Sequence, residues 1–254
     1  MCIRDRGINV FLLASLRFTS PWFLTYLQAQ ELGGHVRKGE KGFLVVKYGT
    51  YRKADDPIPE DGEAAEKHRY LKGYTVFHAS QVEGIAFPAT DNLPELTTSE
   101  KCDRAREIVA AMTNPPAIHE GAAVPCYRRK TDSVHMPERC YVDSEEAFYS
   151  TLFHELTHST GHESRLARKS LLENKGIDAE NKDRETYAEE ELVAEMGASF
   201  LNAHAGIIEA EIENSASYLQ GWIDALKSKD AKGWIIRAAS QAQKAADYIL
   251  NLPR

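Results

Sequence analysis

Apolar residues recur with both helical and strand-like spacing in the first third of the chain. A short apolar run over residues 10–16 predicts a helix, and residues 22–32 predict a second helix, opened by a Thr-Ser-Pro turn and closed by a Gly-Gly pair. Proline suits the first helical position, and glycine suits the position after the last one. Shorter apolar runs at 43–46 and 73–78 predict strands, and the acidic segment 54–66 between them predicts an exposed loop. This mixture indicates a small α/β unit.

A segment rich in proline, threonine and asparagine lies between Gly84 and Ser99. It shows neither helical nor strand periodicity, which predicts a linker. It separates two domains, which we place over residues 7–90 and 98–254. The second domain is predicted to be mainly helical, with strand-like pieces in 117–142 that we expect to form a short antiparallel sheet. The predicted fold class of the whole chain is therefore α+β. Helices of the second domain are expected over residues 100–112, 143–160, 186–204, 214–226 and 231–250.

The helix that begins near residue 143 carries the strongest chemical motif of the chain. Asp143 and Glu146 match a capping box, in which two side chains bond backbone amides of the first turn. Further along, the sequence HELTH places His154 and His158 four residues apart, so both imidazoles share one helix face and can reach one tetrahedral zinc ion. Glu155 then lies beside the open metal position, as a general base for bound water. The structural alternative is a pair of surface histidines on a helix.

A catalytic zinc ion usually has three protein ligands, so the third must come from another segment. The later helix contains YAEEELVAE, in which Glu191 and Glu195 share a face. We predict Glu191 as the third ligand, because apolar residues follow it, and Glu195 as the acceptor for the second N–H of a ligand histidine. For Glu189 and Glu190 the main alternative is an acidic, solvent-facing helix start, which the helix dipole favours.

His162 is a rival third ligand, four residues after His158, but Gly161 is expected to end the helix before it. The metzincin spacing HExxHxxGxxH is not met, because Ser164 stands where that motif has its last histidine. Two roles stay open for His162. It either donates to the transition state from beside the site or caps the end of the helix.

Composition and charge exclude several classes of protein. Hydrophobic residues make up 43% and charged residues 27%, which is typical of a folded globular chain, and no apolar run is long enough to span a bilayer. The four cysteines form no CxxC pair, so we expect neither a disulfide scaffold nor a cysteine-built zinc ribbon. We expect a cytoplasmic protein with no membrane partner. Residues 1–83 carry 12 Lys and Arg against 10 Asp and Glu, a net charge of +2. Because the whole chain has a net charge of −7, the remaining residues carry −9.

Several blocks of sequence resemble those of a known family. Three blocks in the second domain resemble the zincin-like domain of ArdC-type antirestriction proteins: FHELTHSTGHESRL (153–166), YAEEELVAEMGASFL (187–201) and AASQAQKAADYIL (238–250). Two earlier blocks are similar to the amino-terminal domain of that family, which includes plasmid TraC-type primases; they lie at 20–42 and 70–85. Residues 1–6 match nothing in the family, so we expect the first domain to be truncated at its start.

The resemblance implies an amino-terminal domain that binds single-stranded DNA, a metallopeptidase-like domain, and an action on mobile elements that enter a bacterial cell. It also implies that Glu191 completes the metal site. From the residues alone, the aromatic and basic side chains of the first domain are typical of a small core and a solvated turn. With the resemblance, we expect DNA contacts from Trp22, Arg37, Lys38, Lys41 and Tyr74.

Two functions of different classes remain open, and a third, associated with primases, has less support because the sequence shows no acidic polymerase-like cluster beyond the glutamates of the helices. The first is a zinc metallopeptidase, with manganese as the alternative metal, that acts on a restriction enzyme or another protein substrate. The second is a non-catalytic protein that binds DNA or masks a restriction enzyme and holds a structural or vestigial metal. The intact Glu155 favours the first function, because a purely structural ion needs no general base.

Overall fold

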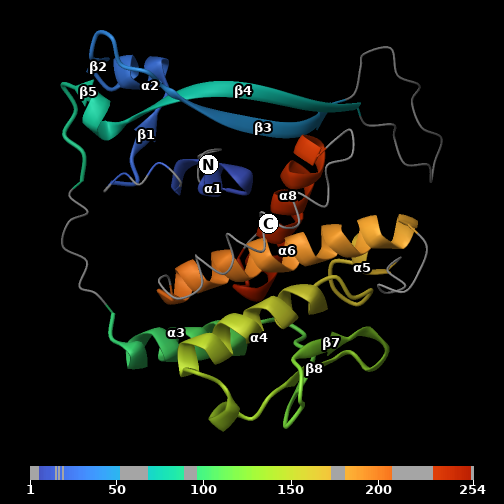
Figure 1. Cartoon of the computed structure of the whole chain (residues 1–254). Coiled ribbons are helices and arrows are strands. Elements are labelled where there is room, and N and C mark those ends of the chain that lie inside the picture. The colour runs from blue at the N-terminus through green and yellow to red at the C-terminus, as the bar shows by residue number, and fades with distance from the viewer. Residues whose placement is uncertain are drawn as a thin grey trace. The chain divides into compact units, whose positions relative to one another are not determined.

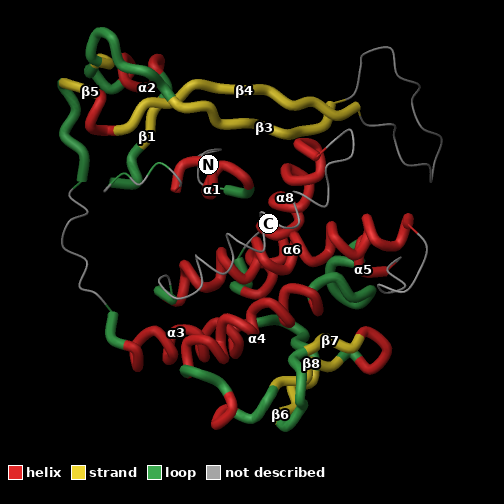
Figure 2. The backbone as a smooth tube through the Cα atoms, in the orientation of Figure 1, coloured by secondary structure: helices red, strands yellow, loops and turns green. Residues whose placement is uncertain are grey.

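The chain divides into two compact units, Met1–Pro94 and Glu95–Arg254. The computed structural model describes residues 6–14, 16, 18, 20–51, 68–88, 96–172, 181–207 and 231–252. The predicted loop 54–66, the predicted helix 214–226 and residues 89–95 of the predicted linker lie outside the described residues. The described elements confirm the α+β class (Figures 1 and 2). No helix in these ranges is long and apolar enough to cross a membrane.

A β-hairpin dominates the first unit. Its two long strands, β3 and β4, pair antiparallel from end to end, and the two-residue strand β1 pairs with the last residues of β4. A separate small ribbon joins β2 to β5. The elements run in the order α1 (Ile8–Ala14), β1 (Phe23–Leu24), α2 (Tyr26–Glu31), β2 (His35–Val36), β3 (Phe43–Tyr51), β4 (His68–His78) and β5 (Val82–Glu83).

The predicted helix over 22–32 is wrong in its first third, because Phe23 and Leu24 form β1. Both side chains are buried by the sheet, so tertiary packing overrides the helical pattern there. The helix starts later, where Thr25 accepts from the Gln28 amide and the Gln28 side chain accepts from the Thr25 amide. This capping box satisfies two amides that an uncapped helix start would leave without partners.

The core of the first unit lies on the face of the hairpin that α1 covers. Buried Phe23, Val45 and Val76 form its centre, and Leu13 and Phe43 pack against them. The helix is also tied to the outer edge of β3. The buried Asn9 side chain accepts from the Val46 amide and donates to the Val46 carbonyl, both at 2.9 Å. An amide side chain thus replaces a neighbouring strand at this point of the edge.

The second unit is mainly helical and contains one small sheet. Its strands are ordered β6-β8-β7; β8 pairs antiparallel with β7 but parallel with β6, so the sheet is mixed rather than antiparallel throughout. Strand-like patterns identify strands, but the pairing partners follow from the path of the chain in space. The elements are α3 (Thr98–Ala111), β6 (Ala117–Glu120), β7 (Cys126–Arg128), β8 (Ser133–Met136), α4 (Glu145–Ser159), α5 (Lys169–Leu172), α6 (Asn181–Ala205) and α8 (Ala231–Ile249).

The helices α4 and α6 lie against each other and form the centre of this unit (Figure 1). Gly197 on α6 allows their close approach, because a Cβ at this position would lie 2.5 Å from Cγ2 of Thr157 on α4. α6 also packs against α8, which buries several small side chains. Five of them are fully buried: Ala238, Ala239, Ala242, Ala245 and Ala246.

The cap of α4 differs by one residue from the predicted one. Ser144, not Asp143, is the N-cap, and its hydroxyl accepts from the Ala147 amide at 3.0 Å. We expect Ser144→Ala to lower the free energy of unfolding by about 1 kcal/mol, because that amide loses its partner. The exposed neighbour gives a matched control, since Asp143→Ala should stay within about 0.5 kcal/mol of the wild type in urea denaturation. Equal losses in the two variants would contradict the assignment of the cap.

Candidate metal centre

Three side chains from α4 and α6 converge on one point. The Nε2 atoms of His154 and His158 lie 3.1 Å apart. His154 Nε2 lies 3.5 Å from Glu191 Oε2, and His158 Nε2 lies 3.6 Å from Glu191 Oε1. Each residue offers one possible ligand atom, and these three atoms lie within 4.8 Å of one another. Among the described residues, no other group of three or more histidine, cysteine or acidic side chains is close enough to hold a metal ion. The structure therefore brings together the three residues that the sequence singles out as ligands.

These distances match the size of a small divalent ion. Bonds of about 2.0 to 2.1 Å in a tetrahedral zinc site separate neighbouring ligand atoms by about 3.3 to 3.4 Å. The three separations observed here lie between 3.1 and 3.6 Å. Three protein ligands also leave the fourth position of a tetrahedron open, which distinguishes catalytic from structural zinc sites.

Each histidine is held from behind by a second carboxylate. His154 Nδ1 lies 3.2 Å from Glu195 Oε1, and His158 Nδ1 lies 3.1 Å from Glu190 Oε1. When Nδ1–H donates to a carboxylate, the lone pair of a neutral imidazole is on Nε2. Two such lone pairs and a carboxylate of Glu191 then face one another. This set of ligand atoms suits a divalent cation at its centre.

The pKa values show how strongly the carboxylates favour positive charge here. Burial alone would lower the pKa of His158, yet its hydrogen bonds to Glu190 and Glu191 outweigh burial and raise it to about 10. In the same way, Glu191 and Glu195 raise the pKa of His154 to about 9 against the effect of burial. Burial acts in the opposite direction on Glu191, but the two histidines hold the pKa of this carboxyl well below its usual range.

Glu190 is the residue that sequence reasoning missed. The interpretation as a solvent-facing acid is wrong for it, because its side chain is 1% exposed. Arg168 Nε donates to it at 2.8 Å and the Ser170 hydroxyl at 2.6 Å, while its other oxygen faces His158. Burial would raise the pKa of Glu190, but mainly the Arg168 guanidinium lowers it to about 2. In the sequence, a run of three glutamates does not show which one is buried.

Arg168 links this carboxylate to the end of the metal-binding helix. It is 4% exposed and donates to the Thr160 hydroxyl at 2.8 Å and to the Thr157 carbonyl at 2.9 Å. A buried guanidinium is tolerated when its N–H groups are matched by acceptors, as they are here. The contacts from Arg168 through Glu190 therefore hold the His158 ring at its Nδ1 side.

Glu155 is buried in α4 with 7% of its surface exposed. Tyr187 lies one turn before Glu191 on α6. Burial, together with the charges of Glu191 and Glu155, raises the pKa of Tyr187 to about 12, so its hydroxyl stays protonated near neutral pH. The tyrosine thus hydrogen-bonds a ligand candidate and is also affected by the charge of the predicted general base. No spacing in the sequence marks Tyr187 as part of the site, although it stands in the same block as Glu191.

The structure does not bring His162 into the three-residue cluster. The helix ends at Ser159, and His162 lies in the turn that follows, where its Nδ1 accepts from the Ser164 amide at 3.2 Å. The hydroxyl of the same serine is 2.8 Å away. The ring therefore organises this turn locally.

The five DNA-contact candidates come from three segments of the first unit: the residue before β1, the turn between β2 and β3, and β4. Arg37 donates to Glu40 at 2.7 Å, which offsets part of the positive charge of its turn, while Lys38 and Lys41 are exposed. The Trp22 indole donates to the Pro88 carbonyl at 3.1 Å. Tyr74, in contrast, is part of β4, opposite Val45.

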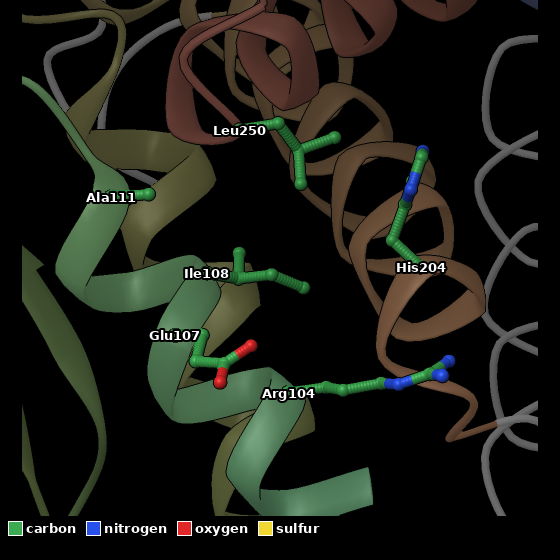
Figure 3. A pocket seen from close by; sticks show the side chains of 6 residues that line it. All are labelled: Arg104, Glu107, Ile108, Ala111, His204 and Leu250. Atoms are coloured by element: carbon green, nitrogen blue, oxygen red, sulfur yellow. The ribbon is translucent and has the colours of Figure 1, made fainter.

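A shallow pocket in the second unit contains none of the metal-site candidates. It lies between α3, the end of α6 and the residue after α8 (Figure 3). Its charged and polar lining comes from Arg104 and Glu107 on one side and His204 on the other, and Ile108, Ala111 and Leu250 complete it. Neither the three ligand candidates nor the second carboxylates line it.

Two family models match the chain, one in each of its two units. Residues 103–241 match a family described as a zincin-like metallopeptidase, and residues 4–77 match the N-terminal domain of the anti-restriction factor ArdC. The protein y4eC of Sinorhizobium fredii (strain NBRC 101917 / NGR234) is 34% identical over 96% of this chain and 77% of its own length. A DNA primase TraC of Escherichia coli is 33% identical over 97% of this chain, which spans 17% of TraC.

Solved structures of one similar protein cover nearly the whole chain. Antirestriction protein ArdC from plasmid R388 is 38% identical in sequence, with a TM-score of 0.69 for both its metal-free and its Mn(II)-bound crystal structures. The matches cover 98% and 97% of this chain and 86% and 84% of the ArdC chains. The chain thus belongs to the ArdC-type antirestriction family, with an ArdC-type amino-terminal domain followed by a zincin-like metallopeptidase domain.

Proposed function

We propose that the second unit is a metal-dependent peptidase in which His154, His158 and Glu191 hold the ion. One observation carries this proposal: two imidazole nitrogens and the Glu191 carboxylate converge, with one ligand atom of each residue within 4.8 Å of the others, and a second carboxylate lies behind each histidine. An ion bound there would lower the pKa of a bound water and would polarise a carbonyl group. A site built only for stability would not need the open fourth position.

In this proposal Glu155 is the general base. Glu155 directly follows the ligand His154 in α4, and its side chain is buried. Its carboxylate would accept the proton of the attacking water and later pass it to the leaving amine. Glu190 and Glu195 keep both imidazoles in the tautomer that offers Nε2 to the centre. Tyr187 donates to Glu191 and helps to orient it.

We infer that zinc is the preferred ion and that manganese is also accepted. Two imidazoles and one carboxylate are ligands typical of zinc peptidases, whereas sites for manganese are usually richer in oxygen. The similar ArdC structure with Mn(II) supports manganese as the alternative. Calorimetric titration of the chelator-treated chain with each ion separately ranks the two affinities.

We further propose that the first unit binds single-stranded DNA and that the protein acts in the cytoplasm on a restriction enzyme or another protein. The match of residues 4–77 to the ArdC amino-terminal domain and the similarity to TraC primases support an association with DNA. In this arrangement the nucleic acid brings the peptidase to its target, and the protein has no membrane partner.

Removal of the metal tests the proposal directly. After treatment with a chelator, we expect cleavage of unfolded casein to stop, with or without single-stranded DNA, and to return on addition of zinc. The melting temperature should fall with the metal, because an ion at 100 times its Kd stabilises the folded state by about 2.7 kcal/mol. A metal-loaded chain that cleaves nothing under either condition would favour a non-catalytic protein that binds DNA or masks a restriction enzyme.

A further inference from the structure

One face of the hairpin β3–β4 carries an unusual set of side chains beyond the core. Two residues that lie opposite each other on neighbouring strands point to the same face of the sheet. Every second such pair along the strands points to that same face. The pairs Phe43↔Val76 and Val45↔Tyr74 belong to the core end of the face. Towards the far end of the strands the same face continues with the pairs Lys47↔Lys72, Gly49↔Tyr70 and Tyr51↔His68.

The far part of this face consists largely of aromatic rings. The ring of Tyr51 lies 5.6 Å from that of His68 and 6.2 Å from that of Tyr70, measured between ring centroids. Tyr70 extends across Gly49, since a Cβ on that glycine would lie 2.7 Å from the tyrosine ring. Any larger residue at position 49 would displace the ring. The glycine therefore makes room for an aromatic surface.

Two lysines stand directly opposite each other beside these rings. Lys47 pairs with Lys72, and the Lys72 ammonium lies 5.2 Å from the centre of the Tyr74 ring. Like charges at directly opposed positions of a sheet destabilise it. The sequences of the two strands, 43–51 and 68–78, contain no Asp or Glu that would offset the pair. An arrangement that costs stability in the free protein points to a negatively charged ligand.

We propose that this surface, formed by Lys47, Tyr51, His68, Tyr70, Lys72 and Tyr74 and termed the aromatic face below, is where unpaired nucleotides bind. Bases stack on aromatic rings whatever their sequence, and the cations contact the phosphates between them. The inference rests on the proposed binding of single-stranded DNA and specifies its surface. It concerns the two strands alone, because the acidic segment 52–67 that joins them lies outside the described residues.

The ligand must have both flat apolar groups and negative charge. An acidic peptide would satisfy the lysines but would leave the rings without stacking partners, and duplex DNA keeps its bases inside the helix. Residues two apart on a strand lie about 6.7 Å from each other, a spacing that the backbone of an extended single strand can follow from ring to ring. A single-stranded oligonucleotide meets both requirements.

The test measures the Kd of the full chain for a labelled oligothymidylate by fluorescence anisotropy. Tyr51→Ala together with Tyr70→Ala should weaken binding about tenfold or more, because two stacking rings are lost. Tyr51→Phe together with Tyr70→Phe should retain binding, since the rings remain. Lys47→Gln together with Lys72→Gln should reduce the slope of log Kd against log salt by about one to two.

The opposite face of the same hairpin provides the matched control. Leu44 and Leu71 are 63% and 54% exposed there, and the double change Leu44→Ala and Leu71→Ala should leave the Kd unchanged. Melting curves of every variant check that the first unit is folded. Wild-type binding that is unaffected by loss of the two tyrosines, or equally weakened by the leucine changes, would overturn the inference and leave single-strand binding intact. If the wild-type protein does not bind the single strand, or binds a matched duplex more tightly, both the inferred surface and the proposed single-strand binding are overturned.

Discussion

Glu190→Ala is expected to weaken metal binding by about 10- to 100-fold and to lower the free energy of unfolding by about 3 to 5 kcal/mol. The first effect follows because His158 loses the acceptor that holds its ring and directs its Nε2 towards the centre. The second follows because Arg168 stays buried without its counter-charge. Calorimetric titration with zinc measures the first effect, and urea denaturation in the presence of a chelator measures the second without a contribution from the ion.

A double variant separates these two consequences. Glu190→Leu combined with Arg168→Met removes both buried charges, so we expect it to recover much of the lost stability but not the metal affinity. The adjacent change Glu189→Gln is the control, because that side chain contacts neither histidine in the cluster described above. Zinc affinity at the wild-type level in Glu190→Ala would show that this carboxylate does not orient His158.

Glu155→Gln is expected to reduce cleavage by about 10²- to 10⁴-fold while zinc affinity stays within a few-fold of the wild type. The amide has nearly the shape of the carboxylate but cannot accept the proton of the attacking water. The ligand candidates His154, His158 and Glu191 are unchanged, so the ion should remain bound. Metal analysis of the purified variant and the rate of casein cleavage under identical loading measure the two quantities.

The exposed glutamate after the helix, changed in Glu163→Gln, controls for the loss of one negative charge near α4 and should cleave at the wild-type rate. If Glu155→Gln cleaves as fast as the wild type, Glu155 is not the base. If Glu155→Gln loses zinc together with cleavage, Glu155 is needed to hold the metal site together rather than to act as the base. Both outcomes differ from that of Glu190→Ala, where affinity falls and the base remains in place.

Local spacing in the sequence accounts for much of the fold and of the site. The two histidines share a helix face because they are four residues apart, which is a property of the helix and needs no tertiary contact. The caps and periods place α4, α6 and α8 within a few residues, and the α+β class follows from the change in composition along the chain. The same spacing on α6 put Glu191 and Glu195 on one face, and the structure brings both to His154.

Other features depend on contacts between distant segments. Phe23 and Leu24 have a helical pattern but become a strand, because β4 offers them backbone partners and burial. The parallel pairing of β6 with β8 likewise follows from the route of the chain rather than from either strand's sequence.

The sequence by itself determined which histidines can share an ion, since one helical turn sets that distance. Only the tertiary structure decided which acid stands behind each of them. Close packing of α6 on α4 at Gly197, together with Arg168 reaching in from the turn after α4, turns Glu190 inward instead of towards solvent. A run of three glutamates has no periodicity that reveals this, because a buried carboxylate is stabilised by partners that lie far away in sequence.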